Sequence, residues 1–275
     1  MTHDPWILIL LGLGVGTLGT LIGAGGGFIL VPVLLVLMPK TDPAQITAIS
    51  LAVVFCNATS GSIAYFRMGR VDLKSAAWFA IATLPGAILG ALGTKWIPRA
   101  QFNLTFGILL VLASFYLIWR PESGTDPGKE PDPTHTRREL TDAEGIEHVW
   151  HFPMWVGLVL SVFVGFFSSM LGIGGGIIHV PVLNRTLNFP VHIATATSHV
   201  ILSIMALVGT MTHIAEGSLA GNFETVALLG GGAIVGAQIG ARLSNFLEGS
   251  GIIRGLAIAL GIVGIRILVM GLKLG

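Results

Sequence analysis

Residues 16–34 read GTLGTLIGAGGGFILVPVL, an apolar segment with three consecutive glycines near its middle. The segment lies in an uncharged run from Pro5 to Pro39, which as a single helix would be roughly 50 Å long at a rise of about 1.5 Å per residue. The hydrocarbon core of a bilayer is only about 30 Å thick. Three glycines followed by Pro32 are also poor helix interior. The run is therefore predicted to form two helical pieces that meet at the glycines and fold into a hairpin.

The same pattern returns in the second half of the chain, where residues 165–183 read GFFSSMLGIGGGIIHVPVL. The two segments are identical at 10 of 19 positions at an offset of 149 residues. Weaker matches continue at offsets of 148 and 146 residues, including the Gly-Ala runs at residues 86–91 and 232–237. We infer that the chain contains two copies of one unit.

The composition is that of a membrane protein. Hydrophobic residues make up 53% of the 275 residues and charged residues 11%, whereas soluble domains carry about 25% charged residues. Each half contains the interrupted run and three further apolar stretches that can cross a bilayer. The sequence thus predicts an all-α integral membrane protein with two repeats, each a Gly-broken helical hairpin plus three transmembrane helices. If each hairpin returns to the side on which it began, the repeats are inverted.

A polar segment separates the two halves. Residues 120–151 contain four of the 15 basic and eight of the 14 acidic residues, together with four prolines. This composition predicts a solvated, weakly structured connector. The expected organisation is a first transmembrane repeat at 1–119, a charged linker at 120–151 and a second repeat at 152–275.

Lysine and arginine positions indicate the orientation. With hairpins, ten of these residues fall on the side of the linker and four on the other side; with single crossings, the tally is eight against six. Because cytoplasmic loops carry the excess of basic residues, the count favours hairpins, inverted repeats and a cytoplasmic linker.

The glycine-rich interruptions are the candidate substrate site, because paired broken helices mark the central site of many secondary transporters. Glycines let backbone N–H groups approach a ligand, and helices beginning near Phe28 and Ile177 would direct their positive ends toward a small anion. The candidate residues in these two segments are Gly25, Gly26, Gly27, Phe28, Gly174, Gly175, Gly176 and Ile177. The alternative is that the glycines only allow tight helix packing.

Polar side chains within the apolar stretches are further candidates, because burying them without partners costs roughly 2–7 kcal/mol. Ser50 and Asn57 lie two helical turns apart and share a face; Ser198 is the counterpart of Ser50, and Gln238 lies in the seventh span. Each is a candidate for substrate binding. Hydrogen bonds to the helix backbone or to a neighbouring helix are the alternative.

Two histidines are candidates for coupling transport to protons, because imidazole titrates near neutral pH. His179 follows the second glycine run at the position where the first half has Leu30, and His199 lies in the next span. A packing role with a single hydrogen bond is the alternative for both.

The doubled motif resembles the TauE/SafE family of sulfite and sulfonate exporters, also called the toluene-sulfonate uptake permease family. The resemblance rests on residues 23–27 with Val31-Pro32, on their copy at 172–176 with Val180-Pro181, and on the Gly-Ala-x-x-Gly run of each third span. It covers both halves. It implies an ion-coupled carrier in a prokaryotic inner membrane that moves sulfite, sulfoacetate or a related organosulfonate.

Several other classes of function find no support in the sequence. It contains no phosphate-binding loop, no cysteine-pair metal motif and no dinucleotide motif after a strand, so we expect no cofactor, no metal and no ATP hydrolysis. The expected partners are a small oxyanion, the lipid bilayer and a coupling proton or cation. Nucleic acid is not expected, and the sequence is compatible with a homodimer. An anion channel or a membrane-embedded enzyme are the alternatives to a transporter.

Overall fold

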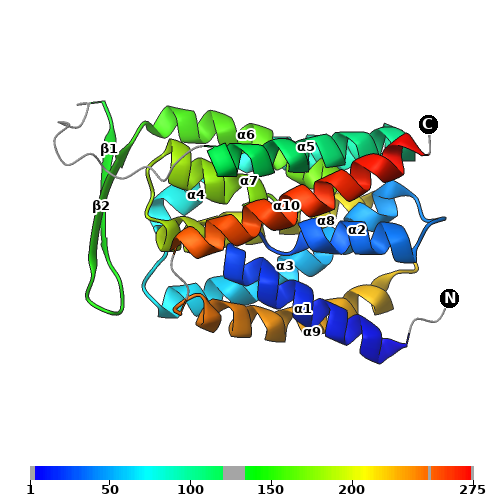
Figure 1. Cartoon of the computed structure of the whole chain (residues 1–275), viewed down its shortest axis with the longest axis horizontal. Coiled ribbons are helices and arrows are strands. Elements are labelled where there is room, and N and C mark those ends of the chain that lie inside the picture. Colours follow the sequence, from blue (N-terminus) through cyan, green and yellow to red (C-terminus); the bar gives the residue numbers. More distant parts are fainter. Residues whose placement is uncertain (1–3, 120–133, 247–248, 274–275) are drawn as a thin grey trace.

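The computed structural model describes residues 4–119, 134–246 and 249–273, and most of these are helical (Figure 1). The helices of the first half are α1 (Pro5–Ile22), α2 (Gly27–Leu37), α3 (Pro43–Arg67), α4 (Leu73–Gly93), the short turn η1 (Thr94–Trp96) and α5 (Arg99–Trp119). Those of the second half are α6 (Met154–Leu171), α7 (Gly176–Pro181), the π-helical turn η2 (Val182–Thr186), α8 (Val191–Ala215), α9 (Phe223–Leu243) and α10 (Gly249–Leu272). The predicted all-α membrane fold is confirmed.

Both interrupted runs break at their glycines. Gly23 ends α1 with φ +82°, and Gly172 ends α6 with φ +70°. Further glycines in both breaks also have positive φ, which residues with a Cβ adopt only with strain. In Figure 1, α2 runs back toward the side on which α1 begins. The predicted breaks are confirmed, and Pro32 lies beyond the first of them, inside α2.

Among the residues that the structure describes, six helices are long and apolar enough to cross a membrane, namely α1, α3, α4, α6, α8 and α9. Large apolar side chains such as Ile81, Leu89 and Phe163 are more than half exposed on the outside of the bundle. Such a surface suits surrounding lipid rather than water.

The two halves pack against each other helix by helix. α1 lies along α9 and α6 lies along α4, while α3 contacts α8 and α5 contacts α10. A Cβ built on Gly16 of α1 would lie 2.5 Å from the carbonyl oxygen of Ala233, and one on Gly86 or Gly90 of α4 would overlap the backbone of α6. The Gly-Ala runs of the third spans therefore allow close helix packing.

The end of the linker segment is folded, which corrects the prediction of a weakly structured connector for residues 136–151. Strands β1 (Thr136–Thr141) and β2 (Glu147–Phe152) form an antiparallel hairpin in which Arg138 pairs with Trp150. The side chains of Trp150 and Phe152 are 1% and 0% exposed because their rings pack on Phe189. These alternate residues supply an apolar face that the overall polar composition conceals. Residues 120–133 of the predicted linker lie outside the described residues.

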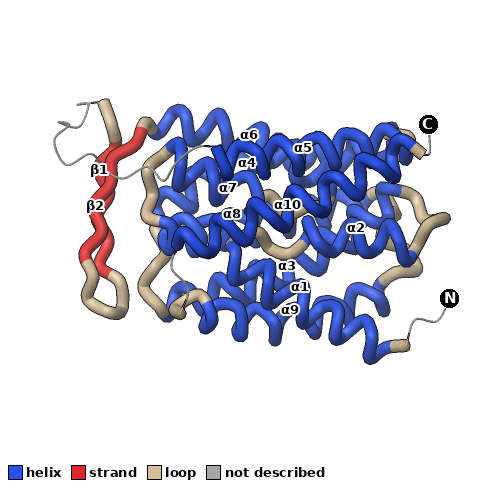
Figure 2. The backbone as a smooth tube through the Cα atoms, in the orientation of Figure 1, coloured by secondary structure: helices blue, strands red, loops and turns tan. Residues whose placement is uncertain are grey.

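The hairpin lies across one end of the helix bundle, where Figure 2 shows the strands in red. We call this end the linker side and the opposite end the far side. α1 begins and α10 ends at the far side (Figure 1). The contact of Phe189 with the hairpin places the segment after η2 at the linker side, where α6 also begins.

Candidate functional site

The two glycine-rich breaks touch each other. We call residues 23–27 the first glycine turn and residues 172–176 the second glycine turn. A Cβ built on Gly27 would lie 2.6 Å from the carbonyl oxygen of Gly172, and one on Gly176 would overlap the carbonyl oxygen of Gly23. Every residue of both turns is buried. The backbones of the two repeats therefore meet inside the bundle at their glycine-rich segments.

Helices α3 and α8 each lie against the glycine turn of the other half. The Cα of Thr47 would be 2.9 Å from a Cβ on Gly172, and the Cγ2 of Thr195 would be 2.7 Å from a Cβ on Gly23. Thr47 and Thr195 are equivalent at the repeat offset of 148 residues. Ser50 Oγ also donates a 2.6 Å hydrogen bond to the carbonyl oxygen of Gly172. Each turn is thus enclosed by a helix of the other repeat.

Several hydroxyl groups near the turns are buried without a hydrogen-bond partner among the described residues. They belong to Thr47, Ser168, Thr195 and Ser198. Ser168 Oγ would lie 3.2 Å from a Cβ on Gly175. An unpaired buried hydroxyl typically costs about 1–3 kcal/mol, so this arrangement suits a ligand that accepts hydrogen bonds. Ser198 differs here from its counterpart Ser50, which has a partner.

A second polar cluster lies beside the first glycine turn. Thr20 Oγ1 donates to Asn57 Oδ1 at 3.0 Å and lies 3.3 Å from His199 Nε2. Tyr65 donates from its hydroxyl to the carbonyl oxygen of Thr20 at 2.8 Å and contacts the ring of His199 edge-on. Asn57 Nδ2 has no partner in the described part of the chain. Two sequence candidates, Asn57 and His199, are therefore joined through Thr20.

Sequence reasoning missed Thr20 and Tyr65. Thr20 precedes the first glycine turn by three residues in an otherwise apolar helix, which was an available signal. Tyr65 lies about two helical turns beyond Asn57 on α3 and gives no comparable signal in the sequence. Only the packing of α1, α3 and α8 places it there.

His179 belongs to a separate contact. Its Nε2 lies 3.2 Å from Ser161 Oγ on α6, within the second helical hairpin. Its Nδ1 has no partner among the residues described. His179 and His199 therefore each have one ring nitrogen close to a hydroxyl group, and they lie in different networks.

The remaining candidates have apolar or interhelical surroundings. The side chains of Phe28 and Ile177 are fully buried in the apolar core, so only their backbone N–H groups are suited to an anion. Gln238 Nε2 donates to the carbonyl oxygen and the hydroxyl of Ser60 at 2.7 and 2.9 Å. Gln238 on α9 thus makes hydrogen bonds to the neighbouring helix α3, which is the alternative to substrate binding named above.

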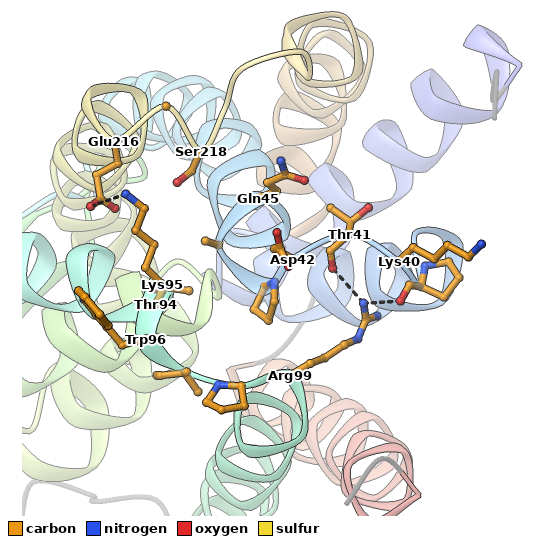
Figure 3. A pocket seen from close by; sticks show the side chains of 16 residues that line it. Lys40, Thr41, Asp42, Gln45, Thr94, Lys95, Trp96, Arg99, Glu216 and Ser218 are labelled. Carbon is orange, nitrogen blue, oxygen red and sulfur yellow. Dashed lines mark hydrogen bonds and ion pairs between the residues drawn. The ribbon is translucent and has the colours of Figure 1, made fainter.

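A pocket of about 620 Å³ lies on the far side, and Figure 3 shows the side chains that line it. Its walls are residues 39–45, 94–99 and 216–218. Thr94 Oγ1 in the wall donates to the carbonyl oxygen of Met170 at 3.0 Å, two residues before that turn. Ala44, also in the wall, lies one helical turn before Thr47. Two residues of the pocket wall, Thr94 and Ala44, therefore lie near the second glycine turn.

Three of the five charged side chains that line the pocket, Lys95, Arg99 and Glu216, make hydrogen bonds or an ion pair. Lys95 Nζ lies 3.2 Å from Glu216, while Arg99 donates to the carbonyl oxygens of Pro39 and Thr41 at 2.6 and 2.9 Å (Figure 3). Arg99 thereby holds the segment that follows α2. Asp42 also lines the pocket, so its lining is mixed in charge.

The chemistry available at the glycine turns is binding by neutral donors. Backbone N–H groups and hydroxyls suit a small oxyanion, as at other glycine-rich anion sites. In the portion of the chain that the structure describes, no group of three His, Cys, Asp or Glu residues is placed to hold a metal ion.

Comparisons with known proteins identify the family of this chain. The profile of the family described as Sulfite exporter TauE/SafE matches residues 8–267. The chain is 30% identical to the probable membrane transporter protein YunE of Bacillus subtilis over 97% of this chain and 98% of that protein. Probable membrane transporter proteins of Methanocaldococcus jannaschii and Xylella fastidiosa are each 26% identical, over 76% and 82% of this chain and 72% and 80% of theirs. No solved structure matches.

These matches cover both repeats and the segment between them. The protein is a multi-pass membrane transporter, and the chain belongs to the sulfite exporter TauE/SafE family.

Proposed function

We propose that the protein is a secondary transporter that exports a small sulfur-containing oxyanion, such as sulfite, sulfoacetate or a related organosulfonate. The observation that supports this most is the contact between the two glycine turns, flanked by buried hydroxyls from both halves. The family description supports the sulfur-containing class of substrate. The host membrane is a prokaryotic inner membrane, with the linker side facing the cytoplasm.

The two repeats are inverted in this proposal and alternate the exposure of one central site. Each repeat supplies one glycine turn and the helix that encloses the other turn, so sliding one half against the other separates the turns and admits the anion. The substrate then contacts backbone N–H groups of both turns and the hydroxyls of Thr47, Ser50, Thr195 and Ser198. The far-side pocket is the mouth on one side of the membrane.

His199 is the proposed site of proton coupling. It shares Thr20 with Asn57, so a change in the charge of its ring alters the hydrogen bonding beside the first glycine turn. His179 is a second proposed coupling group because one of its ring nitrogens has no partner among the described residues.

Flux measurements on purified protein in proteoliposomes test this proposal. With sulfite, sulfoacetate, taurine, thiosulfate and sulfate as a panel, a transporter gives saturable flux and counterflow for at least one sulfur-containing anion. Conductance without counterflow would instead support an anion channel. Chemical conversion of the anion without flux would support a membrane-embedded enzyme.

A further inference from the structure

We propose that the β1–β2 hairpin is a gate that closes the linker-side route to the glycine turns and must undock during each transport cycle. The inference rests on the proposed alternating-access function. In this proposal the hairpin moves during transport, whereas the composition of the segment predicted only a connector.

The internal repeat shows where a second mouth is expected. The far-side pocket is formed by residues 39–45, 94–99 and 216–218. The repeat offsets of 148, 146 and 148 residues relate these three segments to residues 187–193, 240–245 and 68–70. Because the copies have equivalent positions in the two halves, the related segments should line a corresponding mouth on the linker side.

The hairpin contacts the segments that would form this mouth. The backbone N–H of Ala143 donates to the carbonyl oxygen of Met68 at 3.0 Å. The rings of Trp150 and Phe152 pack on Phe189 with centroids 5.0 and 4.9 Å apart. Two of the three segments are therefore contacted directly, and the hairpin lies where the repeat predicts an opening.

The third segment joins the same network through Arg70. The Nη2 of Arg70 lies 3.2 Å from Glu144 in the hairpin turn. The Nη1 of Arg70 donates to Asn245, which belongs to the third segment, at 2.8 Å. The side chain of Arg70 is 8% exposed and that of Glu144 is 59% exposed. One ion pair accessible to water thus joins the turn of the hairpin to the ends of α3 and α9.

The two ends of the hairpin are held differently, which suggests how it moves. The strand ends next to α6 carry the buried rings of Trp150 and Phe152, whereas residues 142–146 are held to the bundle by polar contacts. Because Glu144 is 59% exposed, its ion pair with Arg70 is screened by water and contributes little free energy, so the turn can separate at small cost while the apolar end stays docked. The hairpin would therefore pivot about Phe152, where the chain enters α6.

Accessibility of a buried cysteine measures this opening without any transport assay. Thr195→Cys in a Cys56→Ala background places a reporter beside the first glycine turn, at a position that is 1% exposed. We expect Glu144→Ala to raise its labelling rate by a hydrophilic thiol reagent in nanodiscs about two- to fivefold, the effect of losing one partly exposed ion pair. Glu139→Ala is the matched control, because Glu139 pairs only with Arg137 of the same strand in the described structure. Equal labelling of the two variants would overturn the gate.

A reversible crosslink tests whether the motion is required. Met68→Cys with Ala143→Cys, again with Cys56→Ala, joins the hairpin turn to the loop after α3, where the two backbones are hydrogen-bonded. Oxidation should stop flux and reductant should restore it, while each single cysteine variant is unaffected. Full flux with the crosslink formed would overturn the gate. If no anion is transported even by the parent protein, the proposed function fails, and the labelling experiment still decides whether the hairpin opens.

Discussion

Thr47 and Thr195 occupy equivalent positions in the two repeats, and each lies against the glycine turn of the other half. Their hydroxyls are buried and have no partner in the described part of the protein. In a stable core such groups are usually paired, so their presence at the meeting point of the repeats supports the proposed binding site.

The isosteric variants Thr47→Val and Thr195→Val distinguish a role of these hydroxyls in anion binding from a role in helix packing. Because a hydroxyl is removed that has no partner, we expect the thermal unfolding temperature to stay the same or rise. The affinity for the transported anion should fall about tenfold or more, since a hydrogen bond to a charged group contributes about 1.5–3 kcal/mol. Anion-dependent thermal shifts measure both quantities. Thr59→Val, which removes another unpartnered hydroxyl from α3, should leave the affinity unchanged.

Gly27 tests the contact between the turns. A Cβ at this position would lie 2.6 Å from the carbonyl oxygen of Gly172, so Gly27→Ala should push the turns apart and reduce flux to a few per cent or less. Gly14→Ala on the neighbouring α1 is the matched control, because nothing lies within 4 Å of its built Cβ. Both proteins are compared by flux and by the amount of monodisperse protein recovered. Normal flux in Gly27→Ala would refute the proposed anion site between the two glycine turns.

At the scale of elements, the hairpin turn depends on Asp142. Its Oδ1 accepts hydrogen bonds from the backbone N–H groups of Glu144 and Ile146, both at 3.0 Å, and its Oδ2 lies 3.3 Å from His148. Burial by itself raises the pKa of this carboxyl, but these hydrogen bonds outweigh it and hold the pKa below its usual value of 3.8. The ionised carboxylate therefore organises the turn at neutral pH.

A pH dependence with a definite sign follows. Because the pKa is lower in the folded hairpin, the stabilisation by Asp142 is fully present above pH 3.8 and is lost as the pH falls through the lowered value. Hydrogen exchange of residues 136–152, corrected for its intrinsic pH dependence, should show no loss of this protection between pH 8 and pH 5. Asp142→Asn should lower protection already at pH 7. Equal protection in Asp142→Asn would show that the carboxylate is dispensable.

The helical elements were more predictable than the hairpin for physical reasons. Three adjacent glycines in a run too long for one membrane crossing leave few alternatives to a break, and α2 and α7 begin within one residue of Phe28 and Ile177. The strands were missed because the prolines and acids of residues 120–133 dominate the composition of the linker. The alternation that buries Trp150 and Phe152 was present, but it extends over only one short strand.

At the scale of the whole molecule, the repeats form one interlocked bundle. The first hairpin helix of each half packs along the third span of the other half, as α1 on α9 and α6 on α4. Glycines at these contacts bring backbones together that a methyl group would separate. The sequence showed the duplication, but it held no information on which helices of the two copies would pair, because both copies present similar small-residue faces.

Interlocking predicts that the halves need each other. Residues 1–119 and 134–275, expressed together as separate chains, should assemble and copurify through a tag on one of them. Each half expressed alone should be degraded or aggregate, because its glycine-lined faces lack their partners. Recovery of either half alone as a monodisperse protein would show that the repeats fold as independent units.

The pairing of α1 with α9 also affects how the chain matures on the ribosome. Roughly 200 residues separate the two helices, so at a synthesis rate of about 5–20 residues per second α1 waits on the order of 10–40 s for its partner. During that time its small-residue face is open to any other nascent helix, including α1 of a neighbouring copy. When many copies are synthesised close together, α1 of one chain can therefore pair with a helix of another chain. Slower expression should raise the yield of correctly assembled protein.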